Sequence, residues 1–171
     1  MKRKFIKIVG VVVVVLVAIS VPQLMKATPP SGISFTPVGR ATLPEFDIKR
    51  KDKDLDWEIR LETNQPIDVA TQIVSFPPGA YSGWHTHPGP VFFTVRTGTL
   101  TVYEGNDPTC TGIQFPAGTG AVEAGTPTHV HMVRNETNSL AEAVVTYMVP
   151  VGTLQSQLRS DRPNPGNCPN F

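Results

Sequence analysis

The stretch Gly79-Ala-Tyr-Ser-Gly-Trp-His85-Thr-His87-Pro-Gly-Pro-Val91-Phe-Phe-Thr-Val-Arg-Thr-Gly98 contains two histidines separated by one residue. Side chains two positions apart in a β-strand point to the same face, so His85 and His87 would present two imidazoles to one spot. Neutral imidazole is a frequent protein ligand for Zn, Cu, Fe and Ni. The stretch therefore predicts a strand that supplies part of a metal site.

A second pair with the same spacing, His129 and His131, accounts for the remaining histidines of the chain. Two such pairs on separate strands would converge on one ion if a barrel made those strands neighbours. The alternative is four surface or core histidines that bind no metal. The pairing of all four favours one divalent ion, which could be Zn, Fe, Mn, Ni or Cu.

The sequence around these pairs predicts short strands and many turns. Trp57–Thr63 alternates apolar and charged residues, as a half-buried strand does, and Thr97-Gly98 predicts a hairpin turn. Seventeen Pro and 14 Gly supply turn signals, and no long helical period follows Val21. The pattern predicts an all-β sandwich or barrel. Further expected strands are Val69–Phe76, Val91–Arg96, Thr99–Tyr103, Val130–Asn135 and Ala143–Val149.

The first histidine pair resembles the first motif of the cupin family, which runs Gly, five residues, His-x-His, three or four residues, Glu, six residues, Gly. Gly79, His85, His87 and Gly98 fall in register with it. The stretch from Glu123 to Asn135 is similar to the second motif, Pro-x-Gly-x-x-His-x-x-x-Asn. The resemblance covers roughly residues 65–150 and implies a single cupin (jelly-roll) β-barrel that binds a metal.

Two departures from the family pattern concern the metal ligands. Val91 occupies the position of the usual glutamate and cannot coordinate a metal. Glu104 and Glu123 are candidate replacement carboxylates. Counting back from Asn135 selects His131 as the ligand of the second motif, whereas counting forward from Gly125 stops one residue before His129, so both stay candidates.

Strand parity also predicts what surrounds the site. Val91, Phe93 and Val95 share the parity of the first histidine pair and should line an apolar interior, whereas Met132 and Arg134 should face away. Tyr81 and Trp84 precede the pair. They would form either a pocket rim or ordinary packing.

The N-terminus predicts export. A basic start, Met1–Lys7, precedes an uncharged apolar run over residues 8–21, which is short for a membrane span of ~20 residues. Residues 1–27 would be a cleaved signal peptide or an uncleaved membrane anchor. We expect an extended linker at 28–47, the barrel at 48–154, a Pro-rich tail at 155–171, and an extracytoplasmic location.

Export makes a disulfide the expected state of Cys110 and Cys168, the only two cysteines of the chain. In an oxidising compartment two thiols usually pair. The bond would fix the Pro-rich tail to the barrel. The alternative to a disulfide is two free thiols.

Charge and motifs limit the classes of function. From Thr28 onward, 10 basic and 14 acidic residues give a net charge of −4, which argues against nucleic acid as a partner. No nucleophile elbow or phosphate-binding loop is present, and no catalytic residue can be assigned. The favoured hypothesis is an exported module that binds or senses a small molecule. The alternative is a metal-dependent enzyme of dioxygenase or isomerase type. Homodimerisation is implied only by the resemblance.

Overall fold

The computed structural model describes residues 26–168. The apolar run at 8–21 and the last three residues lie outside the described residues, so the expected signal peptide or anchor remains a prediction. Within residues 26–168, no helix has the length and apolar character needed to cross a bilayer.

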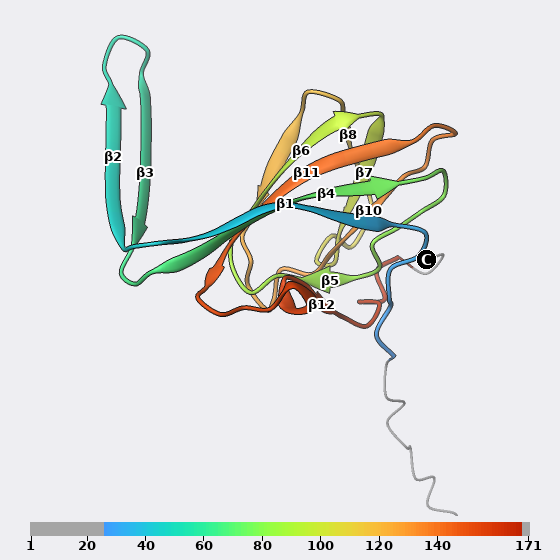
Figure 1. Ribbon diagram of the computed structural model, residues 1–171. Coiled ribbons are helices and arrows are strands. Elements are labelled where there is room, and N and C mark those ends of the chain that lie inside the picture. The colour runs from blue at the N-terminus through green and yellow to red at the C-terminus, as the bar shows by residue number, and fades with distance from the viewer. Residues whose placement is uncertain (1–25, 169–171) are drawn as a thin grey trace, which may run out of the picture.

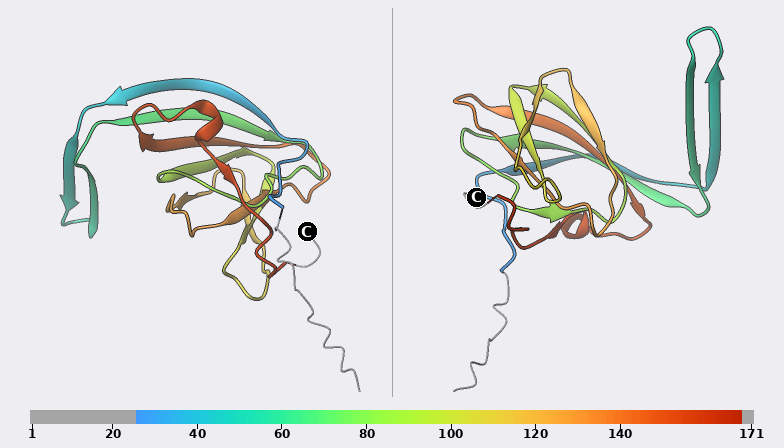
Figure 2. Two further views of the ribbon diagram at one scale, coloured as in Figure 1. Left: turned by 90° about the horizontal axis from the view of Figure 1, so that it is seen from below. Right: turned by 180° about the vertical axis from the view of Figure 1, so that it is seen from behind.

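Antiparallel strands make up most of the described chain (Figure 1). They are β1 (Ser34–Leu43), β2 (Phe46–Asp52), β3 (Trp57–Thr63), β4 (Ile67–Phe76), β5 (His85–Thr86), β6 (Val91–Thr97), β7 (Thr99–Glu104), β8 (Ile113–Pro116), β9 (Gly120–Glu123), β10 (His131–Arg134), β11 (Ala141–Pro150) and β12 (Ser160–Asp161), with a 3-10 turn η1 (Gln155–Gln157). One sheet has the order β1-β4-β11-β6-β9, and a second has the order β12-β5-β10-β7-β8. Figure 2 shows the two sheets stacked as layers, with the β2–β3 hairpin extending beside them.

The core lies between the two larger sheets. β4 and β11 alternate along their length between buried and half-buried residues, as strands with one inward face do. Their inward side chains pack with those of β6, β7 and β10. The all-β barrel expected from the sequence is confirmed. The inward apolar residues include Val74, Phe76, Val91, Phe93, Val95, Leu100, Val133, Val145 and Val149.

Both flanking segments contribute strands to these sheets. β1, in the expected linker, pairs with β4 from Ser34 to Leu43, and β12, in the expected tail, pairs with β5. Leu158 of the tail is 2% exposed and belongs to the core. The limits 48–154 for the barrel domain stay a prediction.

The turn at Thr97 and Gly98 does not close a hairpin. β6 pairs with β11 and β9, whereas β7 pairs with β10 and β8, so the chain crosses here from one sheet to the other. Gly98 has φ +73°, and a Cβ on it would lie 2.8 Å from Cα of Ala141. The prediction of a hairpin was wrong because a glycine turn signals a reversal of the chain, not which strands pair.

The β2–β3 hairpin stands away from the two larger sheets (Figures 1 and 2). The expected half-burial of β3 is not observed. Trp57 is 48% and Ile59 is 39% exposed, and they share a face with Ile48, which is 53% exposed. The opposite face carries ion pairs such as Lys49–Glu58. The alternation of β3 is therefore that of an amphipathic strand whose apolar face is uncovered in the single chain.

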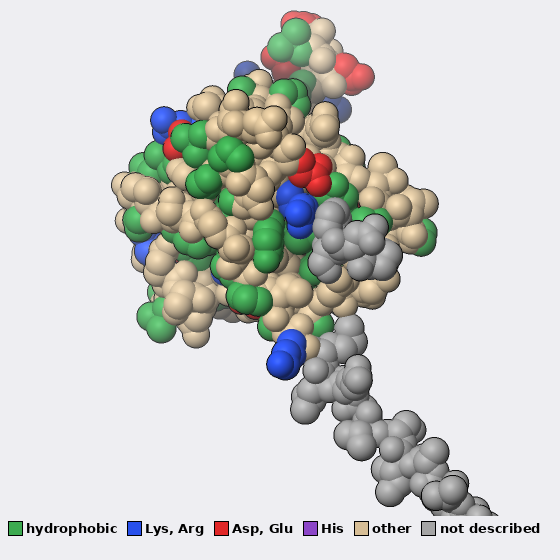
Figure 3. All heavy atoms as spheres, turned by 90° about the vertical axis from the view of Figure 1, so that its right-hand side faces the viewer, with side chains coloured by type: hydrophobic (Ala, Val, Ile, Leu, Met, Phe, Trp, Pro, Cys, Tyr) green, Lys and Arg blue, Asp and Glu red, His purple; other side chains and the backbone are tan. Residues whose placement is uncertain are grey.

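Charge is concentrated on this hairpin. On the face of the molecule seen in Figure 3, charged side chains are few, while they gather at the hairpin, at the top of the view. The hairpin's ion pairs are largely exposed, and such pairs contribute little to stability individually.

The disulfide between Cys110 and Cys168 is present, with 5.3 Å between the two Cα atoms. Cys168 is buried in a small cluster with Trp84 and Met132 outside the main core. Tyr81 packs against the same cluster. Trp84 and Tyr81 were expected to form either a pocket rim or ordinary packing, and the structure shows packing. Met132 belongs to the same cluster and faces away from the histidines, as predicted.

Asp68 joins three segments at one end of β4. Its carboxylate accepts hydrogen bonds from the Thr42 hydroxyl (2.6 Å), the Arg40 guanidinium (2.6 Å) and the Gly152 amide (3.0 Å). These hydrogen bonds, those of Thr42 and Arg40 first, lower the pKa of Asp68 to about 2. The charged form is therefore favoured by folding.

We expect Asp68→Asn to destabilise the fold at neutral pH and to matter less in acid. A lowered pKa contributes stability that is complete above the unfolded pKa of ~3.9 and is lost as the pH falls towards about 2. Urea unfolding from pH 7 to pH 2 measures the gap, which is the difference in the free energy of unfolding between the wild-type protein and Asp68→Asn. A gap that stays constant over this range would contradict the assignment.

Candidate metal centre

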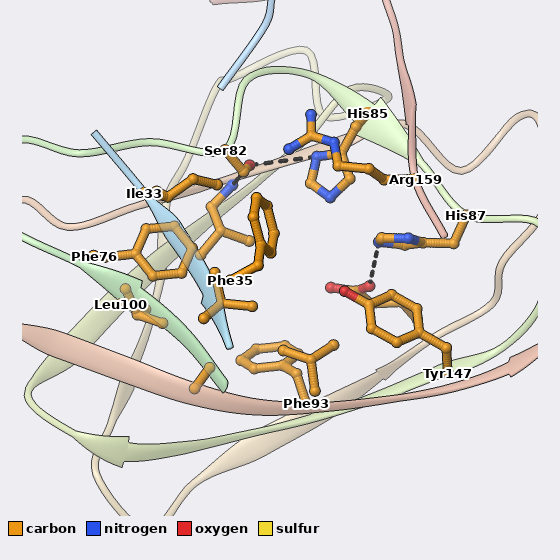
Figure 4. A pocket seen from close by; sticks show the side chains of 15 residues that line it. Ile33, Phe35, Phe76, Ser82, His85, His87, Phe93, Leu100, Tyr147 and Arg159 are labelled. Atoms are coloured by element: carbon orange, nitrogen blue, oxygen red, sulfur yellow. Dashed lines mark hydrogen bonds and ion pairs between the residues drawn. The ribbon is translucent and has the colours of Figure 1, made fainter. Parts of the chain in front are cut away.

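Three of the four histidines meet in the barrel interior (Figure 4 labels two of them). His85 lies in β5, His87 follows that strand directly, and His131 opens β10 opposite His85 in register. They are 5%, 6% and 0% exposed, respectively. One nitrogen of each ring lies within 4.8 Å of one nitrogen of the others. The two short strands thus bring His85, His87 and His131 to one point.

Hydrogen bonds fix the rings of the first pair. Nδ1 of His85 lies 2.9 Å from the carbonyl oxygen of Gly83, and Nδ1 of His87 lies 2.7 Å from that of Leu158. A carbonyl only accepts, so each Nδ1 carries a proton, and in the neutral imidazole this leaves the lone pair of Nε2 to bind a metal. Such a bond to the far nitrogen is the usual support of a metal-bound histidine.

Glu123 of β9 closes the group of side chains. Its carboxylate oxygens lie 3.1 Å from Nε2 of His87 and 3.3 Å from Nε2 of His131, and the residue is 7% exposed. Glu123 is the register partner of Val91 on the adjacent strand, and paired residues point to the same face. The carboxylate absent from position 91 therefore enters the interior from the neighbouring strand.

The electrostatics of the group favour a cation. Burial alone would raise the pKa of Glu123, but the imidazoles of His131 and His87 that face its carboxylate lower it below its usual range. Burial lowers the pKa of His85 well below its usual value, as do the charges of the neighbouring histidines. Burial opposes charge on His131 too, yet Glu123 raises its pKa. The buried carboxylate thus requires positive charge beside it, which a bound metal ion would supply.

Neither ring nitrogen of the fully buried His131 completes a hydrogen bond within the described chain. An orphaned buried nitrogen is costly, so it normally has a partner. Three imidazoles and a carboxylate fit Zn, Fe, Mn, Ni or Cu by their chemistry. The residues present therefore fit the metal that the sequence implies.

His129 lies beside this group and not within it. It precedes β10, and its Nε2 lies 3.0 Å from a carboxylate oxygen of Glu104, at the barrel edge. Glu104 faces His131 in strand register, but its side chain is 32% exposed and is engaged by His129. Of the two candidates left open by the sequence, the geometry brings His131 together with His85 and His87.

The sequence of this region matches a family model described as the cupin domain, over residues 72–147. This part of the chain is a cupin domain. No curated protein matches it.

Solved structures similar to this cupin include enzymes and a domain of a transcriptional regulator. An oxalate oxidase is 25% identical, with 48% of this chain and 46% of that chain covered and a TM-score of 0.40. A cupin domain of an XRE-family transcriptional regulator from Enterobacter cloacae is 16% identical (69% and 97% covered, TM-score 0.43). A DMSP lyase from Ruegeria pomeroyi DSS-3 is 19% identical (50% and 41% covered, TM-score 0.43). This cupin thus spans about half the length of the oxalate oxidase.

A pocket of mainly apolar walls opens beside the histidines of this cupin (Figure 4). As expected, Phe93 lines it, and Val91 and Val95 are completely buried beside it. Tyr147 also reaches the pocket, and its hydroxyl accepts a hydrogen bond from Gln72 at 2.8 Å. Burial raises the pKa of Tyr147, so it stays a neutral hydroxyl whose proton can be donated.

Sequence reasoning missed Tyr147 and Arg159 as pocket residues. Tyr147 belongs to an expected strand, and its inward direction follows from the alternation of β11. Arg159 lies in the polar tail, where no period or motif signals it. Its position depends on the pairing of β12 with β5, a contact between distant parts of the chain.

Proposed function

We propose that this protein binds one divalent metal ion through His85, His87, His131 and Glu123, and uses it to hold a small molecule. The observation that carries the proposal is the convergence of three buried imidazoles, two with lone pairs oriented by backbone carbonyls, on one buried carboxylate. The metal would supply a Lewis-acidic point for a ligand atom.

A small-molecule ligand is supported by the pocket next to the centre. Its walls combine apolar side chains with a few polar groups, as small-molecule sites generally do. Fe, Mn and Ni accept more than four ligands, so four protein groups would leave positions for the molecule. Zn with four protein ligands would be closed and would favour a structural role.

A metal-dependent enzyme on a small organic substrate is the second candidate function. It is favoured by Glu123, which supplies the carboxylate that position 91 lacks, and by the Tyr147 hydroxyl within the same pocket. Redox-active iron in the protein from its natural compartment would support this candidate, whereas zinc held by all four protein groups would indicate a structural metal.

The proposal is tested by metal stoichiometry. Protein stripped with a chelator is reconstituted separately with Zn, Fe, Mn, Ni and Cu, desalted and subjected to elemental analysis. We expect one ion per chain for at least one metal. Far less than one ion for all five metals would refute the proposal.

We further propose that the protein works outside the cytoplasm. The basic start and the apolar run at 8–21 support this, and so does the disulfide between Cys110 and Cys168, because such bonds persist in oxidising compartments. Fractionation of cells that express the native gene checks it. Full-length protein in the cytosol would contradict export by either a signal peptide or an anchor.

A second copy of the chain is the partner we propose for the β2–β3 hairpin. An isolated two-stranded hairpin is marginally stable, so its apolar face needs a cover. That face is continuous with the outer face of the first sheet, because Phe46 and Leu61 line one hollow together with Phe92 and Val122. Phe92 is 39% and Val122 is 63% exposed. In a two-fold dimer each hairpin would cover this surface of the other copy.

Replacing Ile48 and Trp57 together by Gln should therefore yield a monomer. Both side chains lie on the uncovered hairpin face, far from the histidines, so the metal content should stay at the wild-type value. Sedimentation equilibrium gives the mass, with Lys49→Gln on the charged face as the control. A wild-type protein that is already monomeric at micromolar concentration would rule out the dimer.

A further inference from the structure

Arg159 brings a positive charge to the pocket from outside the family motifs. It follows η1 in the C-terminal tail, and its side chain is 15% exposed. It lines the pocket together with His85 and His87, and lines a neighbouring hollow with Gln72 and Tyr147. Figure 4 shows its guanidinium on the same side of the pocket as His85, away from the apolar end formed by Phe76 and Leu100.

The hydrogen-bonding capacity of Arg159 is only partly used. One terminal nitrogen donates to Asp161 at 2.6 Å. Its Nε is buried and has no hydrogen-bond partner within the described residues. Guanidinium is a rigid donor fork suited to carboxylates. A buried donor left without a partner is costly, so Nε marks a place for an acceptor that is not part of the chain.

The charge near Arg159 favours an anion. Glu123 balances only part of the charge of a divalent ion, which leaves the proposed centre with one net positive charge. Arg159 acts on the same region, since its charge contributes to the lowered pKa of His85. Burial in turn lowers the pKa of Arg159 itself. Asp161, its ionic partner, is 35% exposed and lies towards solvent.

The remaining walls limit the size and polarity of the ligand. Apart from Ser82, Glu123 and Tyr147, they are apolar, and they include Phe35, Phe93, Val133 and Val145. The cavity has a volume of about 50 Å³. At about 10–15 Å³ for each water-sized group, it holds on the order of four such groups. A short molecule with one charged end and one apolar end fits both features.

We propose that Arg159 forms the anion-binding part of the pocket and that the ligand is a short-chain monocarboxylate, with its carboxylate at Arg159 beside the histidines and its apolar end among the aromatic side chains. This deepens the proposed function and rests on it for the role of the metal. The contact with Arg159 itself requires only the chain's own residues.

Calorimetric titration with propionate, and with neutral propionamide of nearly the same shape, tests the proposal on metal-loaded full-length protein. We expect propionate to bind and propionamide to bind much more weakly. Arg159→Gln should weaken propionate binding by about 10- to 100-fold, as expected for the loss of a hydrogen bond to a charged group. Arg159→Lys, which keeps the charge and loses the fork, should be intermediate.

Arg96→Gln is the matched control, because Arg96 pairs with Glu142 at the surface and does not line the pocket. Equal propionate affinity for wild type and Arg159→Gln would overturn the proposal, as would equal binding of propionate and propionamide. Metal content of each variant and its circular dichroism are measured in parallel. One ion per chain without propionate binding refutes the anion site alone. Propionate binding that depends on Arg159 in protein that holds no metal supports the anion site and refutes the metal centre.

Discussion

His131→Ala should retain almost none of the metal that the wild-type protein holds, and His85→Ala and His87→Ala should behave alike. Each change removes one of three imidazoles that converge within the buried group. Changes to residues that only support a ligand typically cost about 10–100-fold in metal affinity, so loss of a ligand itself should exceed that range. Elemental analysis after reconstitution and desalting measures the effect.

His129→Ala is the matched control for this series. His129 has the same residue type and lies two positions away, but its Nε2 is engaged with Glu104. We expect it to keep close to one ion per chain. If His129→Ala loses metal while His131→Ala keeps it, the assignment of the second motif is wrong. Equal, negligible binding by wild type and all four variants would show that the histidines are only structural.

Exchanging the side chains of Val91 and Glu123 should preserve most of the metal affinity that Glu123→Val alone removes. Glu123→Val alone removes a charged donor and should weaken metal binding by at least ~10-fold. The double variant Val91→Glu/Glu123→Val should recover most of this loss. The two positions are register partners on β6 and β9, so the exchange keeps the interior volume and moves the carboxylate by one strand.

Competition with a chromogenic chelator gives the affinities of wild type, the single variant and the exchanged pair. Val102→Ala, a core change on β7 that does not touch the pocket, controls for general destabilisation. A single Glu123→Val variant with wild-type affinity would show that Glu123 does not contribute to the centre. Failure of the exchange alone would show that the carboxylate works only from β9.

The parts of the site that follow local rules were predictable from the sequence. Spacing along one strand placed His85 and His87 on one face, and the parity of β6 placed Phe93 inside. The choice between His129 and His131 could not be made from counting, because it depends on where β10 begins. The structure starts that strand at His131 and leaves His129 in the preceding turn.

Contacts between distant segments were not predictable in the same way. Glu123 was only one of two candidate carboxylates, since its partnership with Val91 arises from strand pairing that no local period encodes. Arg159 was missed because the tail lacks a period. The alternation of β3 was correctly recognised as amphipathic, but burial depends on what covers the face, and no other part of the described chain covers it.

The attachment of the tail determines where this protein can be shortened. A polar, Pro-rich C-terminus is normally the first segment removed to improve expression or crystallisation. Here Leu158 provides the carbonyl that orients His87, and the disulfide at Cys168 ties down the residues that follow β12. Trimming before Leu158 would cut away a support of the metal centre, so a shortened chain should keep the residues through Cys168.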